Sequence, residues 1–149
     1  MKPQGHGAIV NISSTAGRMG MPMRMPYSTT KYAVRGLSDA LAVELGEFEI
    51  RVNSILSGLS DGPRGASVVA AQADAAGITP QDYLSAMLHN ISMHSMIRTE
   101  EIASAVLFLA SEQARHVTGQ SLGCQSASKN GSVAHLVQLS CQNAISRRT

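Results

Sequence analysis

The 149-residue sequence predicts an α/β fold, in which parallel strands are joined by helices that cross over the sheet. Three observations support this class. Short β-branched runs alternate along the chain with longer segments of helical periodicity. Hydrophobic residues make up 44% of the chain but aromatic residues only 3%, and this aliphatic composition suits helices packed on a sheet better than a β-sandwich. The length suits about one domain.

The first half of the chain predicts a strand, a helix and a second strand. Residues 8–13 are mostly β-branched and apolar, and glycines and serines flank them. A loop follows over 17–26, where glycine and proline argue against a regular strand. A helix is expected over 27–45, with Gly46 as its stop, and a strand over 50–56. Apolar residues recur every four positions of this helix, at Ala33, Leu37, Leu41 and Leu45, with Val34, Ala40 and Ala42 beside them.

The second half predicts mainly helices. After a loop over 57–63, an alanine-rich segment indicates a short helix over 68–76. A threonine cap, a proline and an acidic residue start another helix at 79. A further helix is expected over 99–111, followed by a short strand over 120–122. The helix over 99–111 has one apolar face, made by Ile102, Ala105, Val106 and Leu109.

The formal net charge of +2 is too small to indicate nucleic acid or a membrane surface as a partner. Residues 1–123 hold nine Lys or Arg and ten Asp or Glu, whereas residues 124–149 hold three and none, so the last stretch is expected to be a divergent basic tail. Cys124 and Cys141 lie in this tail. Without a recognisable secretory signal, they predict free thiols and a cytoplasmic location. No apolar run approaches the ~18 residues of a membrane span.

Tyr27 and Lys31 are candidate catalytic residues. Their spacing of four places them on one face of the predicted helix. An ammonium beside a phenol favours the phenolate, so such a tyrosine can exchange protons near neutral pH. Ser14 ends a predicted strand, and the carboxyl ends of parallel strands are where α/β domains place their sites. Taken separately, the pair also fits an exposed surface contact, and Ser14 also fits a strand-end or helix-cap role.

Several ordered motifs together resemble the C-terminal half of a short-chain dehydrogenase/reductase. They are Gly7-Ala-Ile-Val-Asn-Ile-Ser-Ser14, Pro26-Tyr27-Ser-Thr-Thr-Lys31, Arg51-Val-Asn53, residues 100–111 and Val117-Thr-Gly-Gln120. The resemblance covers roughly residues 5–123, with a variable stretch at about 64–98. It implies the second half of a Rossmann-like, doubly wound parallel sheet with a helical insertion. A basic tail over 124–149 lies outside it.

The resemblance implies an oxidoreductase that transfers a hydride between NAD or NADP and a small carbonyl compound or secondary alcohol. Ser14 would orient the substrate oxygen, Tyr27 would be the acid/base, and Lys31 would assist Tyr27 and bind the nicotinamide ribose. Asn53 would support the site structurally. Cofactor contacts are expected from Tyr27, Lys31, Gly58, Leu59 and Ser60.

The variable stretch over 64–98 matches the region that covers the substrate in this family. It makes Tyr83, Met87, Met93 and Met96 candidate substrate contacts, although packing between helices explains them equally well. Two histidines in this stretch have no cysteine or acid at ligand spacing, so we expect no metal site.

The sequence also departs from the family pattern. Nothing in it matches the glycine-rich dinucleotide loop. The loop over 57–62 lacks the usual proline and threonine, and the tail over 124–149 is unrelated to the family. We therefore expect a truncated form that is inactive by itself. The alternative is a noncatalytic remnant or interaction module. In both cases the resemblance implies self-association through the helix over 27–45.

Overall fold

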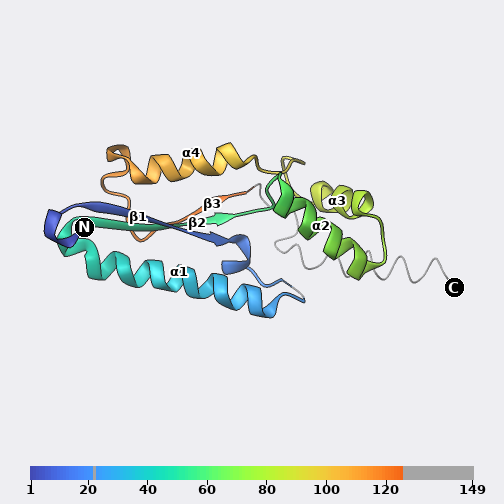
Figure 1. Ribbon diagram of the computed structural model, residues 1–149, viewed down its shortest axis with the longest axis horizontal. Coiled ribbons are helices and arrows are strands. Elements are labelled where there is room, and N and C mark those ends of the chain that lie inside the picture. Colours follow the sequence, from blue (N-terminus) through green and yellow to red (C-terminus); the bar gives the residue numbers. More distant parts are fainter. Residues whose placement is uncertain (22, 126–149) are drawn as a thin grey trace. The chain divides into compact units, whose positions relative to one another are not determined.

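The computed structural model describes residues 1–21 and 23–125, which divide into two compact units (Figure 1). The sheet unit comprises residues 1–58 and 99–125. The helical unit comprises residues 59–98. None of the helices found in this described part of the chain is both long and apolar enough to cross a bilayer.

The sheet has three parallel strands in the order β1-β2-β3, which confirms the predicted fold class (Figure 1). Their bounds are β1 (Gly7–Ser14), β2 (Ile50–Ser57) and β3 (Ser121–Cys124). Ser14 pairs with Ser57, and Ser57 pairs with Cys124, so the three strands end level. This shared carboxyl edge is where parallel sheets place functional residues.

Two helices cover the sheet, α1 (Met25–Leu45) on one face and α4 (Thr99–Ala110) on the other (Figure 1). Each connects parallel strands and therefore runs back across the sheet. Pro26 lies in the first turn of α1, where no amide hydrogen is needed. The described residues also form short 3-10 helices: η1 (Lys2–Gln4) before β1, and η2 (Thr15–Gly17), η3 (Gly46–Phe48) and η4 (Glu112–Ala114) in the connections.

The core of the sheet unit is built around the central strand. Val52, Ile55 and Leu56 of β2 are completely buried, and Leu109 of α4 packs with 1% of its surface exposed. Strand β1 has a strand neighbour on one side only among the described residues, and its Ile12 remains 48% exposed. Leu109 belongs to the apolar face predicted for the helix over 99–111, and its burial confirms that face at this position.

The buried face of α1 agrees only in part with the apolar residues predicted for this helix. Ser38 and Ala42 are the buried residues of this helix, whereas Leu37 is 54% exposed. The side-chain amide of Asn11 in β1 donates to Ser38 Oγ at 3.0 Å. Small side chains let the helix approach the strands closely, and the larger leucines are left on its flanks.

The helical unit contains α2 (Pro63–Ala76) and α3 (Pro80–His89). Helix α2 begins five residues before the predicted 68–76 segment, because a proline in the first helical turn has a backbone already suited to a helix. The predicted cap of α3 is confirmed, since Thr79 Oγ1 accepts a hydrogen bond from the amide of Asp82 at 3.1 Å. The core of this unit consists of Val69, Ala73 and Tyr83 with Leu59, Ile78, Leu84 and Met87 packed against it.

Candidate active site

Ser14 lies at the carboxyl edge of the sheet, where β1 passes into η2. Its side chain is 8% exposed, and Oγ accepts a hydrogen bond from the amide of Ala16 at 3.2 Å. The serine therefore caps η2, as a purely structural role would require. Among the described residues the hydroxyl makes no other hydrogen bond, so its hydrogen is available to donate to a substrate oxygen.

Lys31 connects α1 to the end of β1 through two hydrogen bonds. The hydroxyl of Ser13 donates to the Lys31 carbonyl at 2.8 Å. The Lys31 ammonium donates to the Ile12 carbonyl at 3.1 Å. These bonds place the helix segment that carries Lys31 directly beside the strand segment that ends in Ser14.

Gly17 brings the same helix turn still closer to the strand end. A Cβ at this position would lie 2.7 Å from the Lys31 carbonyl oxygen and 2.7 Å from Ser13 Oγ. Real Cβ atoms do not approach backbone oxygens so closely, so only glycine allows this contact.

We expect Gly17→Ala to destabilise the chain by about 1–3 kcal/mol, because the methyl group must push the Lys31 carbonyl away and break its bond with Ser13. Gly20→Ala is the matched control, since a Cβ there meets nothing within 4 Å. Urea unfolding monitored by circular dichroism measures both variants. Equal midpoints for the two variants would contradict the close approach.

Tyr27 has a cation on each side along α1. The Arg24 guanidinium carbon is 5.0 Å from the centre of the Tyr27 ring, and the Lys31 ammonium is 5.8 Å from it. All three side chains are half-buried. The Lys31 ammonium also donates a hydrogen bond to the Ile12 carbonyl of β1, which a pair confined to the helix surface would not require. Two positively charged side chains therefore lie within 6 Å of the centre of the Tyr27 ring.

Asn53 holds the segment before β3 against the central strand. Its side chain is 1% exposed, its Nδ2 donates to the Val117 carbonyl at 2.8 Å, and its Oδ1 accepts from the Gln120 amide at 3.0 Å. These backbone partners occupy both ends of the amide. The contacts fit the supporting role predicted for Asn53.

Comparisons with known proteins match the part of the chain that contains Ser14, Tyr27 and Lys31. A family model described as enoyl-(acyl carrier protein) reductase matches residues 1–125. The chain belongs to the short-chain dehydrogenase/reductase family. An oxidoreductase of Thermotoga maritima is 40% identical over 119 residues, which are 80% of this chain and 45% of that protein. A 3alpha-hydroxysteroid dehydrogenase of Mediterraneibacter gnavus is 35% identical over 130 residues, which are 87% of this chain and 48% of that protein.

Solved structures of short-chain dehydrogenases/reductases share the fold. An actinorhodin polyketide ketoreductase variant with NADPH aligns with a TM-score of 0.79 at 31% identity, over 83% of this chain and 48% of that one. An NAD+-bound xylitol dehydrogenase aligns with a TM-score of 0.79 at 28% identity, over 85% of this chain and 51% of that one. The chain thus spans about half the length of the relatives that it matches.

The family resemblance implies a nicotinamide cofactor. Tyr27 and Lys31 would offer a phenol and an ammonium to its nicotinamide ribose. The pyrophosphate end has no counterpart among the described elements, because β1 is followed by the three-residue η2 and not by a glycine-rich turn into a long helix. The residues at hand therefore account for only part of a cofactor site.

The other predicted cofactor residues follow β2. The amide of Gly58 donates to the Cys124 carbonyl at 3.0 Å, within the sheet unit. In the helical unit the Leu59 carbonyl accepts from the amide of Ile97 at 3.1 Å, and Ser60 forms a β-bridge with Ile97. The cofactor contacts of Gly58, Leu59 and Ser60 stay predictions.

The predicted substrate contacts all lie in the helical unit. Tyr83 is buried in its core with Met87 packed against it, which is the packing role left open by the sequence. Met93 is 73% exposed, and Met96 approaches Gly65 of α2. Their contacts with substrate stay predictions.

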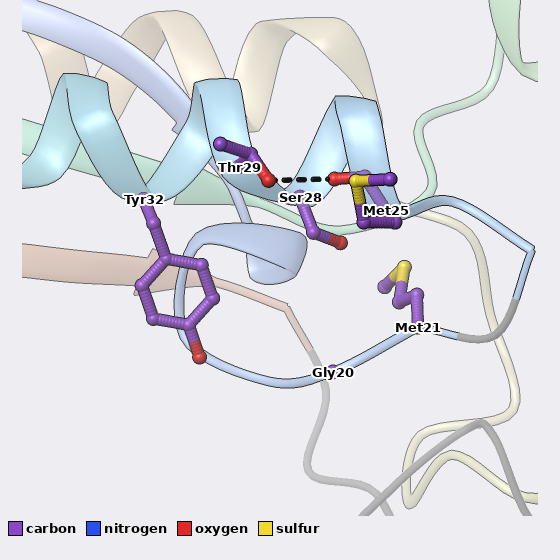
Figure 2. A pocket seen from close by; sticks show the side chains of 6 residues that line it. All are labelled: Gly20, Met21, Met25, Ser28, Thr29 and Tyr32. Atoms are coloured by element: carbon purple, nitrogen blue, oxygen red, sulfur yellow. Dashed lines mark hydrogen bonds between the residues drawn. The ribbon is translucent and has the colours of Figure 1, made fainter.

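A hollow of about 470 Å³ lies beside the loop before α1 (Figure 2). It is lined by Gly20, Met21, Met25, Ser28, Thr29 and Tyr32. Within the described part of the chain, the buried Ser28 hydroxyl has no hydrogen-bond partner. Neither Tyr27 nor Lys31 lines the hollow, so it occupies the neighbouring face of α1 and is not the place where these two side chains meet.

Cysteine chemistry and metal binding have little support in the residues that the structure describes. Burial raises the pKa of the Cys124 thiol, which favours the uncharged, less reactive form. No group of three or more His, Cys, Asp or Glu side chains is placed to hold a metal ion in residues 1–21 and 23–125. Cys141 and most of the predicted tail, residues 126–149, lie outside the described residues.

Proposed function

We propose that Ser14, Tyr27 and Lys31 are the catalytic residues of an NAD(P)-dependent oxidoreductase that interconverts a small carbonyl compound and its secondary alcohol. The observation that supports this proposal most directly is the double attachment of Lys31, one helical turn after Tyr27, to the strand segment that precedes Ser14. Membership of the short-chain dehydrogenase/reductase family supports it.

The proposed chemistry assigns one role to each side chain. The Ser14 hydroxyl donates to the substrate oxygen and orients it. The Tyr27 phenol gives its proton to that oxygen during reduction and takes a proton from it during oxidation. The Lys31 ammonium stabilises the negative charge that this transfer leaves on the phenol oxygen. A bound nicotinamide supplies or accepts the hydride, since no protein side chain can do so.

The remaining contacts belong to the same proposal. Tyr27 and Lys31 would bind the nicotinamide ribose together with the segment over 58–60. The stretch over 64–98 would cover the substrate. Its contacts would come from Tyr83, Met87, Met93 and Met96. A cytoplasmic location remains a prediction.

Self-association through α1 is the second part of the proposal. Tyr32, Leu37 and Val43 expose 44%, 54% and 83% of their surfaces on this helix. Large apolar side chains at the surface of one helix favour association with a partner. The same exposed residues favour the alternative function, a noncatalytic interaction module.

A chimeric protein tests the catalytic proposal. The part of the Thermotoga maritima relative that precedes the matched stretch would be fused to residues 1–125 of this chain. We expect the chimera to oxidise NADH or NADPH in the presence of ketones, because the fusion completes the cofactor site. A chimera that folds and binds the cofactor but turns over no ketone or secondary alcohol would favour the interaction module.

A further inference from the structure

Three cations, Arg18, Arg24 and Lys31, lie close to the carboxyl edge of the sheet in sequence, and residues 1–38 contain no Asp or Glu. Arg18 and Arg24 lie in the connection from β1 to α1, and Lys31 follows two turns later in sequence. A Cβ built on Gly123 would lie 3.9 Å from the Arg18 guanidinium, so Arg18 extends toward the end of β3. Cations therefore gather where the proposed catalytic hydroxyls lie.

Arg24 is the cation at this edge that lies over the phenol and keeps its hydrogen-bond donors free. Its guanidinium carbon is 5.0 Å from the centre of the Tyr27 ring. The ammonium of Lys31 is already bound to the Ile12 carbonyl. The Arg24 guanidinium, in contrast, makes no hydrogen bond or ion pair with any residue in the described ranges 1–21 and 23–125.

The surroundings of Arg24 strengthen its attraction for an anion. Arg24 is half-buried and directly precedes the 21-residue helix α1, whose N-terminus carries partial positive charge. A guanidinium offers five N–H donors in a planar fork that matches a carboxylate or a phosphate. An unpaired, half-buried guanidinium beside a reacting centre is thus suited to bind the charged end of a substrate.

Resting on the proposed function, we propose that Arg24 is a specificity-determining residue that binds the anionic group of the substrate. The substrate class is then an oxo acid or its hydroxy acid, with a carboxylate or phosphate a few bonds from the reacting carbonyl. The carbonyl oxygen of the substrate contacts the Tyr27 phenol, and its anionic group contacts the Arg24 guanidinium. The two side chains are three positions apart in the chain.

A purely structural role for Arg24 is the competing explanation. A guanidinium over an aromatic ring is attracted to its π face, and this contact alone could hold the Tyr27 ring in place. Such stacking does not depend on the charge of the substrate. Discrimination between an anionic ketone and a neutral one of the same shape therefore separates the two roles.

The test uses the 149-residue chain and needs no cofactor. The arginine Nε–H resonances are followed by two-dimensional NMR while levulinate, its neutral methyl ester, or inorganic phosphate is added. We expect levulinate to shift the Arg24 resonance in a saturable manner and the methyl ester to leave it unchanged. Variants of Arg24 lack this resonance, so their affinity is measured from the broadening of the levulinate methyl signal on titration with protein. By this measure Arg24→Gln should weaken levulinate binding about 10- to 100-fold, as expected for the loss of a charged hydrogen-bonding pair.

Two control variants sharpen the test. Arg24→Lys keeps the charge without the planar fork and should bind levulinate with intermediate affinity. Arg35→Gln removes another cation of α1 and should bind levulinate as the parent chain does. Saturable binding of phosphate at Arg24 that exceeds binding of levulinate supports the anion site and assigns a phosphate as the substrate anion.

The proposal is overturned if the ester and levulinate shift Arg24 alike, if neither anion shifts it, or if Arg35→Gln weakens binding as much as Arg24→Gln. Failure of the catalytic proposal is recognised separately. It would appear as a chimera that binds the cofactor without turnover, whereas anion binding at Arg24 is measured without cofactor or reaction.

Discussion

Residues 1–149 by themselves are expected to show no measurable binding of NADH or NADPH and no turnover of ketones. The described sheet has three strands, and no element among the described residues matches the glycine-rich turn that holds the pyrophosphate in this class of fold. Tyr27, Lys31 and the segment after β2 could offer two or three hydrogen bonds. At about 0.5–1.5 kcal/mol each, or about 1.5–3 kcal/mol where charged, these bonds fall short of the ~8 kcal/mol of micromolar binding.

Fluorescence titration of NADH and NADPH with the isolated chain measures this directly, and a panel of ketones measures turnover. The chimera with the Thermotoga maritima relative is the positive control, because it adds the strands and the turn that the isolated chain does not supply. Micromolar binding by the isolated chain would show that these residues form a complete cofactor site, either within one molecule or between two copies.

The second large effect is expected from Tyr27→Phe in the chimera. This change removes the phenol oxygen that is proposed to exchange a proton with the substrate, while the ring can still pack beneath Arg24. Loss of a general acid lowers rates by about 10²- to 10⁴-fold. We expect a loss of this size in kcat with ketones.

Tyr32→Phe is the matched control for this variant. Tyr32 lies on the same helix but lines the hollow on the neighbouring face, so its hydroxyl should not affect the rate (Figure 2). Steady-state kinetics of the two variants side by side make the comparison. If Tyr27→Phe retained most of its kcat, or if both variants lost activity equally, the proposed role of the Tyr27 phenol would be wrong.

The sequence alone predicted the elements whose signals are local. Alternation of β-branched and helical segments was enough to locate β1, α1, β2 and α4, because strand and helix periodicity depend on neighbouring residues. The spacing of Tyr27 and Lys31 placed both on one face of a helix for the same reason. The ordered motifs identified the family, and the match over residues 1–125 confirms it.

Sequence patterns predicted the buried face of α1 and the start of α2 incorrectly in part, because packing and backbone geometry decide these features. Of the apolar residues predicted on α1, Ala42 is buried but Leu37 is not, because close contact with the strands favours small side chains such as Ser38 and Ala42. Helix α2 begins at Pro63, since a proline that ends a loop can equally start a helix. Hydrophobic periodicity does not encode either choice.

The tertiary structure decided how the site is held together. Nothing near Lys31 in the sequence indicates that its ammonium binds the Ile12 carbonyl, 19 positions away, or that Asn53 binds the backbone 64 positions later. These contacts depend on which face of α1 meets β1 and on the position of β3 beside β2. The approach of Arg24 to Tyr27 is local by contrast, since the two residues lie three positions apart at the start of α1. Sequence thus determined which chemical groups this protein carries, and packing between distant segments determined which of them meet.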